Sequence, residues 1–146
     1  MTSKFRPAPL APVSWGELLD KITILEIKAT RIADPAARAN VDRELVLLRN
    51  VAAPVLPQLD LAALVNGLRC VNLELWQIED DIRAKEAAVQ FDVEFIALAR
   101  SVYLTNDKRA ALKRDINALL QSELIEEKYH VTTQAGEARI ADQDRC

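Results

Sequence analysis

The chain has 146 residues, half of them hydrophobic, and its 19 basic and 22 acidic side chains leave a net charge of −3. This length is typical of a single domain, and the hydrophobic share is large enough to form a core without disulfides or metal. A nearly balanced charge excludes the clustered basic surface of nucleic-acid-binding proteins, so we expect no nucleic-acid partner.

Composition also argues against a membrane protein, a metalloprotein and a nucleotide-binding protein. No apolar run approaches the roughly 20 residues that span a bilayer, and three prolines interrupt the first 13 residues, so we expect a cytoplasmic protein without membrane contact. The single histidine, His130, and the two distant cysteines, Cys70 and Cys146, predict no metal site. The three glycines form neither standard phosphate-binding motif, and we predict no cofactor.

The first elements follow a proline-rich, extended arm over residues 1–13. Ser14 and Glu17 have the spacing of a capping box, which predicts a helix from Trp15 to about Ala33. Asp34 and Pro35 are suited to the first positions of a second helix, which we expect to end near residue 50. The first helix has an apolar stripe of Leu18, Ile22, Leu25, Ala29 and Ile32, and the second has one of Val41, Leu45 and Leu48.

The third predicted helix is the longest. Two prolines precede it, Asp60 is its expected N-cap, and it runs to about Ala87. Its heptad pattern is typical either of the central helix of a bundle or of a homodimer seam, and we favour the bundle. Gly67, inside the helix, would allow close approach of another helix. The heptad consists of Leu61, Leu64, Leu68, Val71, Leu75, Ile78 and Ile82.

Two further helices complete the predicted domain. The fourth runs from Asp92 to about Leu104, residues 105–107 break and recap the chain, and the fifth ends near Tyr129. Residues 131–146 are polar without periodicity, which predicts a disordered tail. The sequence therefore predicts an all-α, single-domain helical bundle of about five helices over residues 14–130, with one long central helix.

Polar side chains form stripes beside the apolar ones on three of the helices. Asn72, Trp76, Glu79 and Arg83 recur at intervals of four, three and four residues, so they share one face of the third helix. If the stripes converge, they form a cationic pocket floored by a tryptophan and suited to a small anion. The alternative is boundary surface, with long side chains covering the core. The candidate ligand-binding residues are Lys21, Lys28, Arg31, Trp76, Glu79, Arg83, Arg109 and Lys113.

The acidic residues of the third helix do not predict catalysis. Glu79 precedes Arg83 by four residues and Asp81 precedes Lys85 by four, which is the favoured order for ion pairs on a solvated helix face rather than for a metal site. No histidine lies near a nucleophile within the helical part, and we predict no catalytic residues. The leading hypothesis is a non-catalytic binding or adaptor module with a protein or small-anion partner. The alternative is a small, mutase-like helical enzyme that acts on an anionic metabolite.

Residues 12–28 (PVSWGELLDKITILEIK) and 105–117 (TNDKRAALKRDIN), with residues 74–80 and 126–129, carry a family resemblance. Over about residues 12–130 the chain resembles a bacterial, all-helical domain family of unknown function. Members are small proteins of this kind or are joined to tetratricopeptide or glycosyltransferase regions. The resemblance implies a role beside cell-surface saccharide biosynthesis and supplies no catalytic residues. Residues 18–32 are also similar to the opening helix of helical chorismate mutases, over that one helix, which implies the mutase-like alternative.

Overall fold

The structure is a computed structural model that describes residues 4–130. Within that range it contains four α-helices and no strand, so the all-α fold is confirmed. The helices are α1 (Trp15–Arg31), α2 (Pro35–Ala52), α3 (Leu59–Ala87) and α4 (Val93–Leu119). Residues 4–13, in the predicted extended arm, form no helix, and the tail predicted over 131–146 lies outside the described residues.

Three of the four helices begin at residues whose side chains cap them. Ser14, Asp34 and Asp92 each accept a hydrogen bond from the backbone N–H three residues further on. The expected cap of α3 is wrong, since Gln58 occupies the N-cap without a side-chain bond. Asp60 lies in the first turn instead, where its negative charge interacts favourably with the positive end of the helix dipole.

The fourth and fifth predicted helices are one helix, α4, which runs through residues 105–107 without a break. Thr105 is only 2% exposed because it packs inside the domain. The Asn106 Oδ1 accepts a hydrogen bond from Arg109 Nη1 at 3.4 Å instead of capping a new helix. Weak helix propensity at two positions costs well under 1 kcal/mol each, and packing against α3 offsets it.

The C-terminal end of α4 also differs from the prediction, since the helix stops at Leu119 rather than near residue 129. Gln121 adopts a left-handed conformation with φ of 50°. The Ser122 N–H donates to the Asn117 carbonyl at 2.8 Å, which is the closing bond of a Schellman motif. The chain then turns back along α4, where Lys128 forms an ion pair with Asp107.

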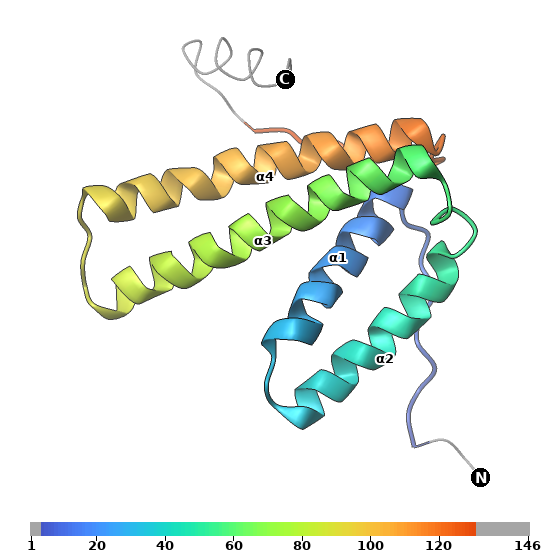
Figure 1. Cartoon of the computed structure of the whole chain (residues 1–146), viewed down its shortest axis with the longest axis horizontal. Coiled ribbons are helices and arrows are strands. Elements are labelled where there is room, and N and C mark those ends of the chain that lie inside the picture. The colour runs from blue at the N-terminus through green and yellow to red at the C-terminus, as the bar shows by residue number, and fades with distance from the viewer. Residues whose placement is uncertain (1–3, 131–146) are drawn as a thin grey trace.

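The four helices are arranged as two antiparallel hairpins (Figure 1). α1 contacts the other three helices, whereas α2 contacts α1 alone among the helices. Figure 1 shows α1 starting beside the α3–α4 hairpin and diverging from it toward its own C-terminal end. As a result, the end of the α3–α4 hairpin near residues 79–104 projects beyond the other two helices.

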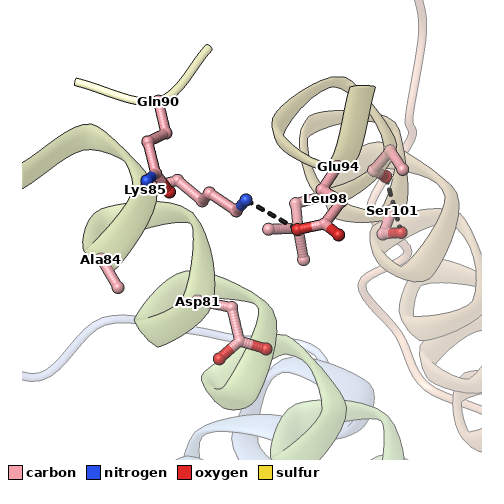
Figure 2. Close-up of a pocket in the computed structure, with 8 residues that line it drawn as sticks. Asp81, Ala84, Lys85, Gln90, Glu94, Leu98 and Ser101 are labelled. Carbon is pink, nitrogen blue, oxygen red and sulfur yellow. Dashed lines mark hydrogen bonds and ion pairs between the residues drawn. The ribbon is translucent and has the colours of Figure 1, made fainter. Parts of the chain in front are cut away.

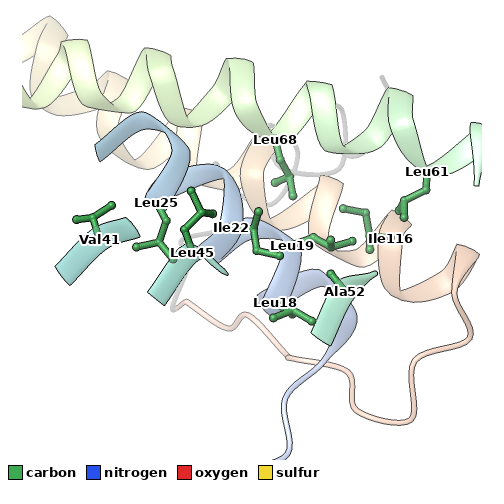
Figure 3. Close-up of a cluster of buried hydrophobic side chains, with 10 residues drawn as sticks. All are labelled: Leu18, Leu19, Ile22, Leu25, Val41, Leu45, Ala52, Leu61, Leu68 and Ile116. Carbon is green, nitrogen blue, oxygen red and sulfur yellow. The ribbon is translucent and has the colours of Figure 1, made fainter. Parts of the chain in front are cut away.

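The hydrophobic core lies around α1 (Figure 3). Leu18 and Leu19 are both buried although they are neighbours, because α2 covers one side of α1 and the α3–α4 hairpin covers another. Gly67 marks a close approach of α3 to α4, since a Cβ atom there would lie 3.1 Å from the Leu112 side chain. The core consists of Leu18, Leu19, Ile22, Leu25, Val41, Leu45, Ala52, Leu61, Leu68 and Ile116.

Candidate functional site

A cavity of about 410 Å³ lies between α1 and the α3–α4 hairpin, where α1 begins to diverge. Its apolar wall comes from two isoleucines of α1, Leu75 and the Trp76 ring, and amide, carboxylate and guanidinium groups supply the rest. This combination of a mainly apolar pocket with a few convergent polar groups is typical of ligand sites. The lining residues are Ile24, Ile27, Asn72, Leu75, Trp76, Glu79, Asp80, Arg83, Asn106 and Arg109.

Two polar side chains of the cavity, those of Asn72 and Arg109, are held by Asp20, a carboxylate that is only 1% exposed and is not itself part of the lining. Arg109 Nε lies 3.0 Å from both carboxylate oxygens of Asp20, and Arg109 Nη2 donates to Oδ2. Asn72 Nδ2 donates to Asp20 Oδ1 at 2.8 Å and to Thr23 Oγ1 at 2.9 Å. The buried charge is thus paired and hydrogen-bonded, as a charge in a protein interior must be.

Helix periodicity explains why these groups meet. Gly16, Asp20, Thr23 and Ile27 are spaced by four, three and four residues, so they share a face of α1, and all four are buried. Hydrogen bonding to Asp20 is the main reason that the pKa of Arg109 is raised above its already high ordinary value, although burial opposes it. Arg109 therefore stays charged and fixed between α1 and α4.

The structure brings together four of the eight residues that the sequence proposed as a ligand site. Trp76, Glu79, Arg83 and Arg109 all line the cavity. Lys113 does not, because its Nζ lies in ion pairs with Glu17 at 2.5 Å and Glu126 at 3.0 Å.

The three basic residues of α1 also lie outside the cavity lining. Lys21 faces α2 and pairs with Glu44 at 2.7 Å. Lys28 and Arg31 lie in the last turn of α1, which is the end that diverges from the hairpin. The expected convergence of three cationic stripes is therefore not what the fold produces.

The charges in the cavity nearly cancel. Arg83 Nε lies 3.2 Å from Glu79 Oε2, and Arg109 is paired with Asp20. Asp80 adds a further carboxylate to the lining. The lining thus holds two carboxylates and two guanidinium groups, and the buried Asp20 pairs with Arg109, so the cavity lacks the positive charge that the sequence predicted.

A second polar cluster fixes the start of α1 against the end of α4; we call it the α1 cap cluster and define it by Ser14, Glu17, Lys113, Asn117 and Glu126. The Ser14 Oγ donates to Glu126 Oε1 at 2.8 Å and accepts from the Glu17 N–H at 3.1 Å. Asn117 Oδ1 accepts a hydrogen bond from the Gly16 N–H at 2.7 Å. The amide groups exposed at a helix start are thereby satisfied within the protein, which leaves this terminus structural.

The titration of the α1 cap cluster follows from its contacts. Burial alone would raise the pKa of Glu126, but hydrogen bonds from Lys113 and Ser14 outweigh it, and the pKa is lowered. Burial alone would lower the pKa of Lys113, but hydrogen bonds to Glu17 and Glu126 outweigh it, and that pKa is raised. Both groups are held in their charged forms at neutral pH.

We expect Glu126→Gln to reduce stability at pH 7 and to have a smaller effect at pH 3. The pKa of Glu126 is lower in the folded state than in the unfolded state, so its stabilisation is fully present above an ordinary glutamate pKa of about 4.3. It is lost as the pH falls through the lower, folded-state pKa. Because the side chain is half exposed, the loss at pH 7 is at most about 1 kcal/mol. Urea unfolding at both pH values measures it, and an equal loss at pH 3 would contradict the assignment.

The residue that sequence reasoning missed is Asp20. A signal was present, because Asp20 and Thr23 continue a four–three pattern beside the apolar stripe of the same helix. An acidic residue in such a position is most often a solvated neighbour of the core. Only the position of Arg109, 89 residues away in sequence, makes Asp20 a buried partner.

Within residues 4–130, no group of three or more histidine, cysteine, aspartate or glutamate side chains is placed to hold a metal ion. No helix in that range is long and apolar enough to cross a membrane. Comparisons of the chain with protein-family models, with curated proteins and with solved structures found no match. The resemblances noted in the sequence therefore stay predictions, and functional reasoning depends on the cavity itself.

Proposed function

We propose that this protein is a non-catalytic binding module and that the cavity between α1 and the α3–α4 hairpin is its ligand site. The observation that supports the proposal is the internal pairing of both arginines that line the cavity. Arg109 is held by a buried aspartate, so its charge is already neutralised within the fold. Groups fixed in this way can orient and recognise a ligand, whereas a reaction would need a charged group that changes its interactions as bonds change.

The chemistry of the lining favours an uncharged ligand that bears hydroxyl groups. A guanidinium group has five N–H groups, and Asp20 and Asn106 engage only part of those on Arg109. Asn72 uses its amide N–H groups on Asp20 and Thr23, which leaves its Oδ1 as an acceptor beside the cavity. A hydroxyl group both donates and accepts hydrogen bonds, so it can bind to the remaining N–H donors of Arg109 and to the Asn72 acceptor.

The Trp76 ring and the nearby isoleucines would cover the apolar face of such a ligand. An anion would find no uncompensated positive charge, because both arginines are paired with carboxylates and Asp80 adds another, which weakens the alternative of an enzyme acting on an anionic metabolite. A link to cell-surface saccharide biosynthesis agrees with a hydroxyl-rich ligand but depends on the family resemblance. A protein partner and a homodimer also stay predictions.

The test uses the two tryptophan indole N–H signals in a ¹⁵N–¹H spectrum of the whole protein. Trp76 lines the cavity, whereas Trp15 packs against the core at the start of α1 and serves as an internal reference. We expect neutral sugars such as glucose or N-acetylglucosamine, at tens of millimolar, to shift the Trp76 signal and not the Trp15 signal. Sodium phosphate and succinate should shift neither.

A matched pair of variants checks where the ligand binds. Asn106→Ala removes a polar group of the cavity, and Asn66→Ala removes an exposed amide elsewhere on the hairpin. The Trp76 shift should weaken in the first variant and persist in the second. A Trp76 response to phosphate or succinate alone would overturn the ligand class, and no response to any compound would overturn the proposed site.

A further inference from the structure

A groove of about 570 Å³ crosses the projecting end of the α3–α4 hairpin (Figure 2). It shares no lining residue with the cavity beside α1. Ala84, Ala97 and Leu98 supply apolar surface, and carboxylates of Asp81 and Glu94 stand at its sides. Among residues 4–130, the two helices that form it are the only helices there, because α1 packs against the other end of the hairpin and α2 packs on α1.

This end of the hairpin carries the net charge of the protein. Residues 79–104 contain six acidic and three basic side chains, a difference of −3, which equals the net charge of the whole chain. The single lysine of the groove, Lys85, is already paired with Glu94 at 2.6 Å and Asp92 at 2.9 Å. Asp81 accepts a hydrogen bond from Gln77 at 2.9 Å, and within residues 4–130 it forms no ion pair. The groove therefore presents unneutralised negative charge.

Large apolar side chains are exposed beside the acidic ones. Val93 is 81% exposed, and it precedes Ala97 by four residues, so it extends the apolar line of the groove by one turn. Val89 is 73% exposed and Phe91 and Ile96 are each 56% exposed, and all three lie within the same short stretch of chain. A concentration of exposed apolar surface with a rim of one charge sign is typical of a protein-binding site.

We propose that this groove binds a basic amphipathic helix of a partner protein. An apolar side chain of that helix would occupy the space over Ala84, Ala97 and Leu98, and lysine or arginine side chains would pair with Asp81 and Glu94. Recognition of an amphipathic helix in a groove is a recurrent mode of protein association. A second copy of the chain is a poorer occupant, because two acidic hairpin ends repel each other. The same charge opposes an anionic membrane surface.

The probe is a fluorescein-labelled amphipathic helix of about 14 residues made of leucine and lysine, titrated with the full-length protein by fluorescence anisotropy. A peptide with glutamate in place of lysine is the charge control. We expect the lysine peptide to bind, to weaken as salt is raised, and to bind at least about tenfold more tightly than the glutamate peptide.

The variant Ala84→Lys/Ala97→Lys fills the groove with two cations at exposed helix positions, where lysine is compatible with folding. Ala39→Lys/Ala62→Lys adds the same charge at exposed positions elsewhere. We expect the groove variant to weaken peptide binding about tenfold and the control variant to leave it nearly unchanged, with equal melting temperatures. Equal losses in both variants, equal binding of both peptides, or a parent dimer that only the groove variant dissociates would each overturn the proposal.

Discussion

Replacing Arg109 by alanine should lower the free energy of unfolding by about 3–5 kcal/mol, the usual cost of removing one partner of a buried ion pair. The reason is that Asp20, almost fully buried, would lose the only cation with which it pairs in residues 4–130. Asn72 would still donate to one oxygen of the carboxylate, but a single amide does not replace a guanidinium that contacts both. Urea unfolding followed by circular dichroism at pH 7 measures the change.

Arg83→Ala is the matched control for this prediction. Arg83 lines the same cavity and pairs with a carboxylate, but its side chain is 78% exposed, so its loss should cost less than about 0.5 kcal/mol. Asp20→Asn combined with Arg109→Ala should recover part of the stability, since no buried charge is then left unpaired. If Arg109→Ala and Arg83→Ala proved equally stable, the described role of the Asp20–Arg109 pair would be wrong.

Gly16→Ala should lower the free energy of unfolding by about 2–4 kcal/mol, through overpacking and a lost hydrogen bond. A Cβ atom at Gly16 would lie 2.6 Å from the Lys113 carbonyl oxygen and 3.0 Å from Asn117 Oδ1. The carbonyl belongs to the backbone of α4 and cannot rotate away, so α1 must move. That movement would also stretch the 2.7 Å bond from the Gly16 N–H to Asn117.

Gly67→Ala provides the comparison, because it places the same methyl group at another helix contact. There the neighbour is the Leu112 side chain at 3.1 Å, which can adjust its rotamer. Alanine also gains about 1 kcal/mol of helix propensity over glycine, so the net change should be close to zero. Thermal unfolding of both variants distinguishes a backbone obstacle from a side-chain one, and equal destabilisation would contradict the distinction.

Helices were the part of the fold that periodicity and caps could predict. The apolar stripe of α1 and the caps Ser14 and Asp34 are local features, and the structure contains them. The break expected at residues 105–107 was wrong because Thr105 is buried by tertiary packing, which local propensity does not contain. The end of α4 was missed for a related reason. Gln121 adopts the left-handed conformation that ends a helix, and that position is usually occupied by glycine or asparagine.

The candidate site was predictable only within one helix at a time. The spacing of Trp76, Glu79 and Arg83 predicted a shared face of α3, and the three residues do line one cavity. Sequence could not give the angle at which α1 crosses the hairpin, and that angle takes Lys28 and Arg31 away. It also could not show that Arg109 meets a carboxylate of α1, which removes the expected positive charge of the cavity.

The contacts that hold α1 on the hairpin have a consequence for the order of folding. The Gly16–Asn117 and Asp20–Arg109 bonds join residues 101 and 89 positions apart, whereas the two hairpins are each made of helices adjacent in the chain. Closing a loop of that length carries an entropy cost before any contact repays it. We therefore expect both hairpins to form early and their docking to limit the folding rate. Although most of its contacts join residues close in sequence, the protein would then fold more slowly than its helix content suggests.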